Sequence, residues 1–305
     1  MQVIATAGHV DHGKSALIAA LTGMQPDRLE QERRRGLSIE LGFAWTAGHD
    51  LPPVAFVDVP GHERFVGTML AGVGEVPAVL FVLAADAGWQ QQSTEHLGVL
   101  DALGVSRGLL VITKTDLAAP DAAAGQADRE LRGTTLAGLP SVAVSARTGA
   151  GLPQLRAALA DLVRALPEPD PAAAVRLWVD RSFTIGGAGT VVTGTLAAGT
   201  LSVGDQLQLG AEGKLVGVRG LQSMDTPQAT ATGVSRVAVN LRGVARDEIT
   251  RGDVLLSPDA WLGTDVSDVV LEWPGAQLRL PATLTVHVGA AAVPARLRPL
   301  SSTPT

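Results

Sequence analysis

The chain has 305 residues, about enough for two domains, and its 24 Lys and Arg against 30 Asp and Glu leave a formal net charge of −6. This mildly acidic balance argues against nucleic-acid binding through a strong overall positive field, so any RNA contact has to be local. The lack of cysteine excludes disulfides, a thiol nucleophile and zinc–thiolate sites, and fits a cytoplasmic protein.

The first half of the chain alternates short apolar runs with stretches rich in Ala, Leu, Glu and Arg at helical spacing. This alternation predicts an α/β domain, with a mostly parallel sheet and flanking helices. An amphipathic helix is expected over Leu152–Leu166, and the Ala-rich, weakly patterned segment Ala118–Gly138 is interpreted as a loop. The most apolar run, Val76–Ala85, is far shorter than the roughly 20 residues that span a bilayer, so no membrane association is predicted. The expected strands are Val3–Ala7, Val54–Val59, Val79–Ala84, Leu109–Thr113 and Val142–Val144.

A proline-rich linker, Pro167–Pro171, separates this domain from a region with a different residue pattern. From Val175 onward, short β-branched runs are interrupted by glycines, which is typical of an antiparallel β-barrel. We therefore predict a P-loop domain over residues 1–168, a β-barrel over 172–260, and the start of a second, incomplete barrel over 262–305.

The segment Gly8–Ser15 fits the pattern G-x-x-x-x-G-K-[S/T], after an apolar strand and before a helical run. In this context backbone N–H groups and a helix N-terminus surround phosphate oxygens. Lys14 is expected to reach the terminal phosphates, and the Ser15 hydroxyl to bind Mg²⁺. The predicted nucleotide-binding residues here are Gly8, His9, Val10, Asp11, His12, Gly13, Lys14 and Ser15.

A second phosphate-facing segment, Asp58-Val59-Pro60-Gly61-His62, lies where a strand ends. Asp58 is placed to hold Mg²⁺ through water, and Gly61 can offer an N–H to a γ-phosphate because it has no side chain. His62 is then the candidate for orienting the attacking water. A histidine in this place is by itself more often a polar surface residue, but the neighbouring motif favours the catalytic role.

Selection of the base is assigned to Thr113-Lys114-Thr115-Asp116, also at the end of a strand. An ionised Asp116 only accepts hydrogen bonds, so it suits the ring N–H and exocyclic amine of guanine. Lys114 would lie along the base, and Ser145-Ala146 could supply a backbone N–H to the guanine carbonyl. The three segments together predict a site for GTP or GDP with Mg²⁺.

In their order, GHVDHGKS, DVPGH, TKTD and SAR make the first domain resemble the translational GTPases. The resemblance implies ribosome-stimulated GTP hydrolysis through His62. It also implies a switch I at about Leu29–Phe43, where Ser38 would join Mg²⁺, and an apolar gate of Val10 and Leu37 that holds the histidine back. Further implied roles are a monovalent cation near Asp11 and nucleotide binding by Arg147 in the SAR motif.

The stretch Asp27–Phe43 and the threonine at Thr113 are most similar to the selenocysteine-specific elongation factors. Their likeness extends to the barrel, where it implies an aminoacyl pocket of Asp180, Arg181 and Arg236. A selenol is ionised near neutral pH, so two guanidiniums could bind it while Asp180 holds one of them. The alternative is that both arginines are solvated rim residues with an incidental carboxylate. The implied partners are selenocysteinyl-tRNA and the ribosome.

Such factors continue through a complete third domain into winged-helix modules that bind an mRNA hairpin, whereas Leu262–Pro299 resembles only the start of a third domain. Binding of an mRNA hairpin is therefore not expected of this chain. Two alternatives stay open: a general elongation or initiation factor, and the GTPase subunit of a sulfate-activating enzyme. Whether Arg181 and Arg236 affect the choice of cargo would distinguish a selenocysteine-specific factor from a general elongation or initiation factor. Failure to bind any aminoacyl-tRNA would favour the GTPase subunit of a sulfate-activating enzyme.

Overall fold

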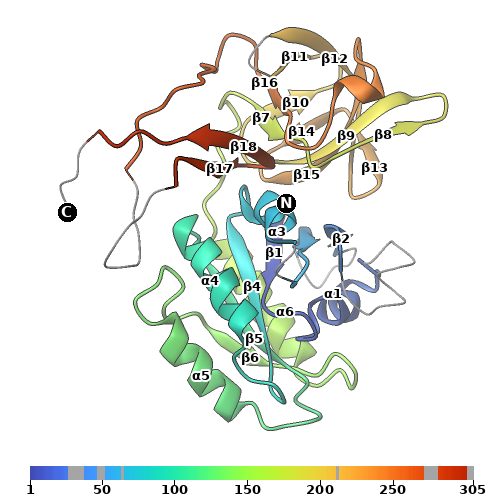
Figure 1. The fold of residues 1–305 in the computed structure, drawn as a ribbon. Coiled ribbons are helices and arrows are strands. Elements are labelled where there is room, and N and C mark those ends of the chain that lie inside the picture. The colour runs from blue at the N-terminus through green and yellow to red at the C-terminus, as the bar shows by residue number, and fades with distance from the viewer. Residues whose placement is uncertain (27–37, 47–51, 63–64, 211–212, 271–280, 301–305) are drawn as a thin grey trace.

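The structure is a computed structural model that describes residues 1–26, 38–46, 52–62, 65–210, 213–270 and 281–300. The expected switch I residues up to Leu37, with the gate residue Leu37 itself, lie outside the described residues. An α/β domain occupies one end of the molecule and a β-barrel the other (Figure 1).

The α/β domain is built on a six-stranded sheet in the order β2-β3-β1-β4-β5-β6. All neighbouring strands are parallel except the edge strand β2, which runs antiparallel to β3. This confirms the predicted α/β class and its mostly parallel sheet. The strands are β1 (Gln2–Ala7), β2 (Gly42–Trp45), β3 (Val54–Asp58), β4 (Ala78–Ala84), β5 (Gly108–Thr113) and β6 (Ser141–Ala143).

Helices cover both faces of the sheet, so the central strands β1, β4 and β5 are buried along their whole length. Side chains of α3, α4 and α5 join the core on one face, and those of α1 and α6 join the core on the other. The helices are α1 (Lys14–Thr22), α3 (Val66–Val73), α4 (Gln91–Ala102), α5 (Asp121–Leu131) and α6 (Leu152–Ala165).

Helix α5 lies inside the segment Ala118–Gly138, so the interpretation of that segment as a loop is wrong. Ala123, Ala127 and Leu131 are spaced four residues apart and are buried against the sheet. Alanine has the highest helix propensity, and its small side chain lets the helix approach the core closely. Alanine occupies exposed as well as buried positions of this helix, as at Ala122 and Ala123, so the alanine-rich composition hides the face that is buried.

The second domain is a closed antiparallel barrel, as predicted. Six strands form the ring in the order β11-β16-β7-β9-β15-β12, and the pairing of β12 with β11 closes it. Alternate residues of β15, such as Val237, Val239 and Leu241, point into the barrel core. The elements are β7 (Arg176–Trp178), β8 (Arg181–Ile185), β9 (Gly189–Leu196), β10 (Thr200–Ser202), β11 (Gln206–Leu209), β12 (Lys214–Ser223), β13 (Thr226–Gln228), β14 (Thr230–Thr232), β15 (Ser235–Arg242), the 3-10 turn η2 (Arg246–Glu248) and β16 (Val254–Leu256).

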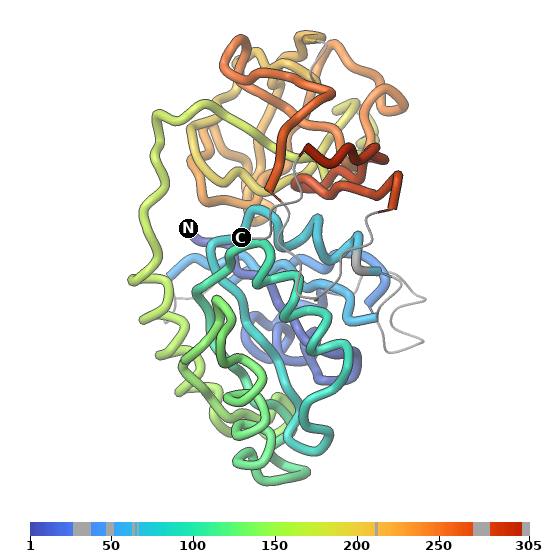
Figure 2. Tube along the Cα trace, turned by 60° about the vertical axis from the view of Figure 1, so that its left-hand side comes forward, coloured from blue at the N-terminus to red at the C-terminus, as the bar shows by residue number. Residues whose placement is uncertain are grey.

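After the barrel, the described residues contain one antiparallel pair, β17 (Thr283–Val288) with β18 (Ala291–Arg296). The turn between them packs on the barrel, since a side chain at Gly289 would come within 2.3 Å of the Trp178 ring. Figure 2 shows this pair, in dark red, beside the barrel and above the α/β domain. Within the described parts of the chain, no helix is long and apolar enough to cross a membrane.

Several barrel arginines form hydrogen bonds or ion pairs with the α/β domain. Arg251 donates to the Gly67 carbonyl (3.1 Å) and to Thr68 Oγ1 (3.3 Å), at the beginning of α3. Arg176 pairs with Glu75 (3.2 Å), and Arg181 donates to the Leu41 carbonyl just before β2. The barrel therefore contacts the end of the expected switch I, at Leu41, and the beginning of α3.

Candidate functional site

The phosphate loop lies between β1 and α1, and its backbone takes conformations that favour glycine. Gly8 has φ +124°, and a Cβ there would come 2.1 Å from the Val82 carbonyl oxygen. Gly13 has φ +81° and caps α1. The first intrahelical bond runs from the Leu17 N–H to the Gly13 carbonyl (2.8 Å), so the N–H groups of the first turn face the loop. This geometry suits an anion.

Gly61 packs directly on the phosphate loop. A Cβ at Gly61 would come 2.5 Å from both Lys14 Nζ and the Val10 nitrogen, so only glycine fits without displacing the loop. Lys14 is buried and donates to the carbonyls of Gly8 and His9, each at 2.9 Å. The structure thus brings together the two segments that were predicted to face the phosphates.

The three residues predicted to bind Mg²⁺ also converge. Ser15 Oγ donates to Asp58 Oδ2 (2.6 Å) and lies 3.1 Å from Ser38 Oγ. Thr6 Oγ1 donates to Asp58 Oδ1 (2.7 Å) and orients the carboxylate, which is fully buried. Carboxylate and hydroxyl oxygens are hard ligands, so this donor set fits Mg²⁺. Thr6 was missed by sequence reasoning, because no motif includes it.

His62 follows Gly61 and is half-buried, with its ring 6.0 Å from the ring of Phe65. It therefore lies at the edge of the phosphate site. Asp11 is exposed at the tip of the loop and has φ +62°, a left-handed conformation. Val10, the described partner of the expected apolar gate, donates its N–H to Gln92 Oε1 (3.2 Å).

The base motif is tied both to the phosphate loop and to the SAR segment. Thr113 Oγ1 donates to the His12 carbonyl (2.6 Å). Asp116 accepts from Ser145 Oγ (2.6 Å) and from Arg147 Nε (2.8 Å). The Ser145 bond, reinforced by Arg147, holds the pKa of Asp116 below its ordinary value. The carboxylate is therefore an ionised acceptor held in one orientation.

Two further observations concern the residues that were predicted to contact the guanine base. Lys114 has φ +56° and its Nζ lies 3.5 Å from Asp86. The Ser145 N–H donates to the Ala150 carbonyl (2.9 Å), so Ala146 is the better placed of the two predicted donors to a guanine carbonyl.

Two buried histidines lie around the phosphate loop. His12 is 1% exposed and bonds through Nδ1 to the Val82 carbonyl (3.2 Å); burial lowers its pKa to about 4. His96, on α4, is 2% exposed, and its Nδ1 accepts the Gly8 N–H (3.0 Å). Burial, with the positive charge of Lys14, lowers the pKa of His96 to about 3. Both rings are neutral at physiological pH.

The stability of the nucleotide-free chain should therefore fall on mild acidification. The unfolded chain binds protons on these histidines below pH about 6.5, whereas the folded chain does not until pH about 4 for His12 and about 3 for His96. Within that window each histidine should lower the free energy of unfolding by about 1.4 kcal/mol per pH unit. Urea unfolding at pH 6.5, 6.0, 5.5 and 5.0 measures the slope, and comparison with a histidine variant cancels the contribution of carboxylates such as Glu75, whose pKa is raised by burial. His96→Asn should reduce this slope by about the contribution of one histidine. Equal slopes in both proteins would contradict the lowered pKa of His96.

The predicted aminoacyl residues meet at the interface of barrel and α/β domain. Arg236 on β15 donates through both terminal nitrogens to the Asp180 carboxylate, with Nη2 at 2.6 Å from Oδ1. Thr193 Oγ1 donates to the same Oδ1 (2.7 Å). This bidentate ion pair is buried, with 13% of the Arg236 side chain and 4% of the Asp180 side chain exposed.

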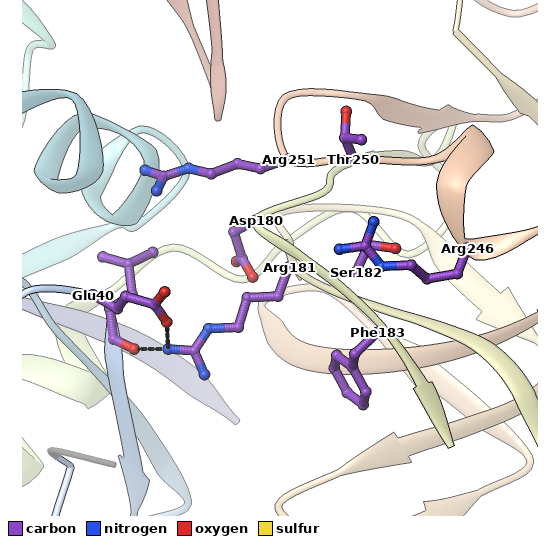
Figure 3. Close-up of a pocket in the computed structure, with 9 residues that line it drawn as sticks. Glu40, Asp180, Arg181, Ser182, Phe183, Arg246, Thr250 and Arg251 are labelled. Atoms are coloured by element: carbon purple, nitrogen blue, oxygen red, sulfur yellow. Dashed lines mark hydrogen bonds and ion pairs between the residues drawn. The ribbon is translucent and has the colours of Figure 1, made fainter. Parts of the chain in front are cut away.

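Phe43 of β2 joins the two arginines. The guanidinium carbon of Arg236 lies 3.9 Å from the centre of the Phe43 ring, and that of Arg181 lies 4.8 Å from it. Arg181 also reaches toward Glu40 (3.7 Å), as Figure 3 shows. Both guanidiniums thus contact an aromatic ring and are not solvated rim groups. The sequence places Phe43 only at the end of the expected switch I. Its contact with the two barrel arginines cannot be inferred from that segment alone.

A pocket of about 360 Å³ opens beside these residues, between the end of the expected switch I and the barrel (Figure 3). It is lined by both charged and polar side chains from the two domains. The lining residues are Glu40, Leu41, Asp180, Arg181, Ser182, Phe183, Arg246, Thr250 and Arg251.

Comparisons with known proteins agree with this arrangement. Residues 1–165 match the model of the elongation factor Tu GTP-binding domain, and residues 189–256 match that of elongation factor Tu domain 2. A curated relative, the selenocysteine-specific elongation factor of Desulfomicrobium baculatum, is 43% identical over 88% of this chain and 43% of the relative. The chain therefore spans less than half the length of that relative.

Two solved structures are similar to the whole chain. A bacterial selenocysteine-specific elongation factor superimposes with a TM-score of 0.89 at 30% identity, over 99% of this chain and 52% of that one. The translation elongation factor SelB of Methanococcus maripaludis, in complex with the GTP analogue GppNHp, superimposes with a TM-score of 0.81 at 25% identity, over 96% and 64%. From the match of its first 165 residues, the chain belongs to the family of translational GTPases defined by the elongation factor Tu GTP-binding domain.

Proposed function

We propose that this chain binds GTP and hydrolyses it to GDP and phosphate when a ribosome engages it. The supporting observation is the convergence of four segments: the phosphate loop, the Asp58–His62 segment, the base motif and the SAR segment. Backbone N–H groups of the loop and Lys14 bind the phosphates. Asp116 accepts hydrogen bonds from guanine, and Ala146 donates to its carbonyl.

Ser15, Ser38 and Asp58 would hold Mg²⁺ in this site. When bound there, the ion supplies positive charge next to the terminal phosphates, where negative charge develops during hydrolysis. Asp58 is kept in place by Thr6, and Ser38 depends on the position of switch I. Asp11, at the exposed tip of the loop, is the residue beside which a monovalent cation would bind.

His62 orients the attacking water. Its place next to Gly61 brings it to the phosphate edge, and the family resemblance implies that contact with the ribosome sets its final orientation. Hydrolysis in the absence of the ribosome is therefore slow, as in GTPases that lack the complete catalytic arrangement on their own.

The cargo is selenocysteinyl-tRNA, carried in the cytoplasm to the ribosome. The observation that carries this proposal is the pair of guanidiniums on Phe43, one of them locked by Asp180, at the interface of the two domains. A selenolate is an anion near neutral pH and would form charge-assisted hydrogen bonds there, whereas a neutral seryl hydroxyl would form weaker ones. Arg181 also contacts Leu41 within the expected switch I, which joins the cargo site to the nucleotide state.

Protection of the aminoacyl ester tests the cargo. The GTP-bound chain should slow ester hydrolysis of selenocysteinyl-tRNA more than that of the seryl form of the same tRNA. Arg236→Leu should reduce this preference by about ten- to a hundredfold, since hydrogen bonds to charged groups contribute about 1.5–3 kcal/mol. Asp180→Asn should weaken it less, because the arginine is retained. Arg219→Leu, at an exposed barrel arginine, is the matched control.

The outcomes separate the hypotheses. Equal protection of both esters would leave a tRNA carrier without selenium specificity, as expected of a general elongation or initiation factor. No protection by a folded chain that binds GTP would contradict the tRNA cargo for this chain and would favour a GTPase subunit with a protein partner.

A further inference from the structure

Helix α3 is held against the barrel at both of its ends. In its first turn, Gly67 and Thr68 accept hydrogen bonds from Arg251. Just after its last turn, Glu75 Oε1 accepts a hydrogen bond from Arg176 Nη2 at 3.2 Å. The second contact is an ion pair between two side chains, whereas the first is made to a backbone carbonyl and a hydroxyl. The strongest electrostatic link between α3 and the barrel is therefore expected at Glu75.

The Glu75 carboxylate depends on the barrel for its partners. Only 14% of its side chain is exposed. Burial raises the pKa of Glu75 above its ordinary value, while the charge of Arg176 and hydrogen bonds from Arg176 and Trp178 oppose that rise. Both partners lie on β7 (Arg176–Trp178). The ionised carboxylate is therefore stabilised only as long as β7 stays next to the end of α3.

The segment that follows the barrel encloses the same ion pair. The guanidinium carbon of Arg176 lies 4.8 Å from the centre of the Trp261 ring, and Trp261 Nε1 donates to the carbonyl just before β7 (3.0 Å). The turn between β17 and β18 packs between Trp178 and α3, since a Cβ at Gly74 would lie 3.5 Å from the Gly289 Cα. Three parts of the chain therefore meet at this ion pair, and its arginine is held in place on two sides.

The two elements joined by the ion pair lead to the two proposed sites. Helix α3 begins four residues after His62, in a chain segment whose Gly61 packs on the phosphate loop. Strand β7 ends at Trp178, two residues before Asp180 and three before Arg181. Segments next to the γ-phosphate change their position between the nucleotide states of GTPases. An ion pair between α3 and β7 can carry such a change to the cargo site.

We propose that Glu75 is a positioning residue for the cargo: through its ion pair with Arg176 it sets the place of Asp180 and Arg181 according to the nucleotide that is bound. The inference rests on the proposed binding of GTP and selenocysteinyl-tRNA. Without the ion pair, α3 and β7 can move more independently. The affinity for the cargo should then depend less on the nucleotide, because coupling between two sites is the ratio of the affinities in the two states.

The test measures the affinity of the full chain for selenocysteinyl-tRNA with a non-hydrolysable GTP analogue and with GDP. Glu75→Gln removes the charge but keeps the size and an acceptor for Trp178. It should lower the ratio of the two affinities by about fivefold, the lower end of typical coupling, since 40% of the Arg176 side chain is exposed and solvent screens the pair. The affinity for labelled GDP should not change, because the substitution lies outside the nucleotide motifs.

Further variants test the ion pair itself. Arg176→Gln should also lower the ratio, and combining it with Glu75→Gln should lower it no further, because two residues that act through one contact are not additive. Arg176→Lys keeps the positive charge and should retain most of the ratio. Asp128→Asn makes the same change from acid to amide in an exposed ion pair with Arg132 on α5, and it should leave the ratio unchanged. Unfolding midpoints of all variants measure any general loss of stability.

Each outcome decides between a positioning role and a structural one. An unchanged ratio in Glu75→Gln, or single effects that add in the double variant, would overturn the positioning role. Equal loss of cargo affinity with both nucleotides would overturn it too, because a general loss of structure has that effect. If the folded, unchanged chain bound the cargo equally well with both nucleotides, or not at all, the proposed function would be refuted and this inference with it.

Discussion

Replacing His62 by alanine should leave GTP binding within about threefold of the unchanged chain and lower ribosome-stimulated hydrolysis by about 10²- to 10⁴-fold, the usual contribution of a positioned acid–base group. The physical reason is its place directly after Gly61, which packs against Lys14 and the Val10 nitrogen. The imidazole is thus near the γ-phosphate edge but outside the set of contacts that hold the phosphates. Single-turnover hydrolysis with and without ribosomes measures the effect.

Two controls make the result specific. Intrinsic hydrolysis without ribosomes should change much less, because the histidine depends on a further contact for its catalytic position. GDP release should be unaffected, because the imidazole lies outside the contacts that hold the phosphates. Normal stimulation of the His62→Ala chain would remove the histidine from the mechanism, and a lack of stimulation of the unchanged chain would contradict the ribosome as its partner.

Asp116→Asn should convert the base site from guanine to xanthine nucleotides. The carboxylate accepts from the ring N–H and amine of guanine, while an asparagine amide can donate to the additional carbonyl of xanthine. A site built on such hydrogen bonds discriminates by about 10⁴-fold, so the affinity for GTP should fall by about that factor and XTP should become the preferred ligand. Equilibrium titration with labelled GTP and XTP measures both changes.

Ser145→Ala is the matched control for this switch. It removes the hydroxyl that donates to Asp116 Oδ1 but keeps the carboxylate and Arg147. The affinity for GTP should fall by about tenfold, the cost of one ordinary hydrogen bond, with no gain for XTP. If Asp116→Asn still selected GTP, another residue would have to recognise the base.

The sequence was most informative where structure is local. Strand, loop and helix from Gln2 to Thr22 follow directly from the apolar run, the glycines and the helical stretch. The strands at Val54, Ala78 and Gly108 and the helix from Leu152 agree with the expected runs to within two residues. Helix α5 was missed because alanine occupies both its exposed and its buried positions, which hides the buried face in the composition. The edge strand β2 was missed because it is short and lies within the expected switch.

By itself, the sequence determined the class of the first domain and the positions of its nucleotide motifs, since phosphate and base are bound by consecutive residues at strand ends. Only the tertiary structure decided which distant side chains meet. Asp180 and Arg236 are 56 residues apart, and Gly8 and His96 are 88 apart. Such contacts depend on strand register, barrel closure and the docking of the two domains, which no local pattern encodes. Phe43 lies between two arginines because the barrel packs against β2, and that packing is a property of the whole fold.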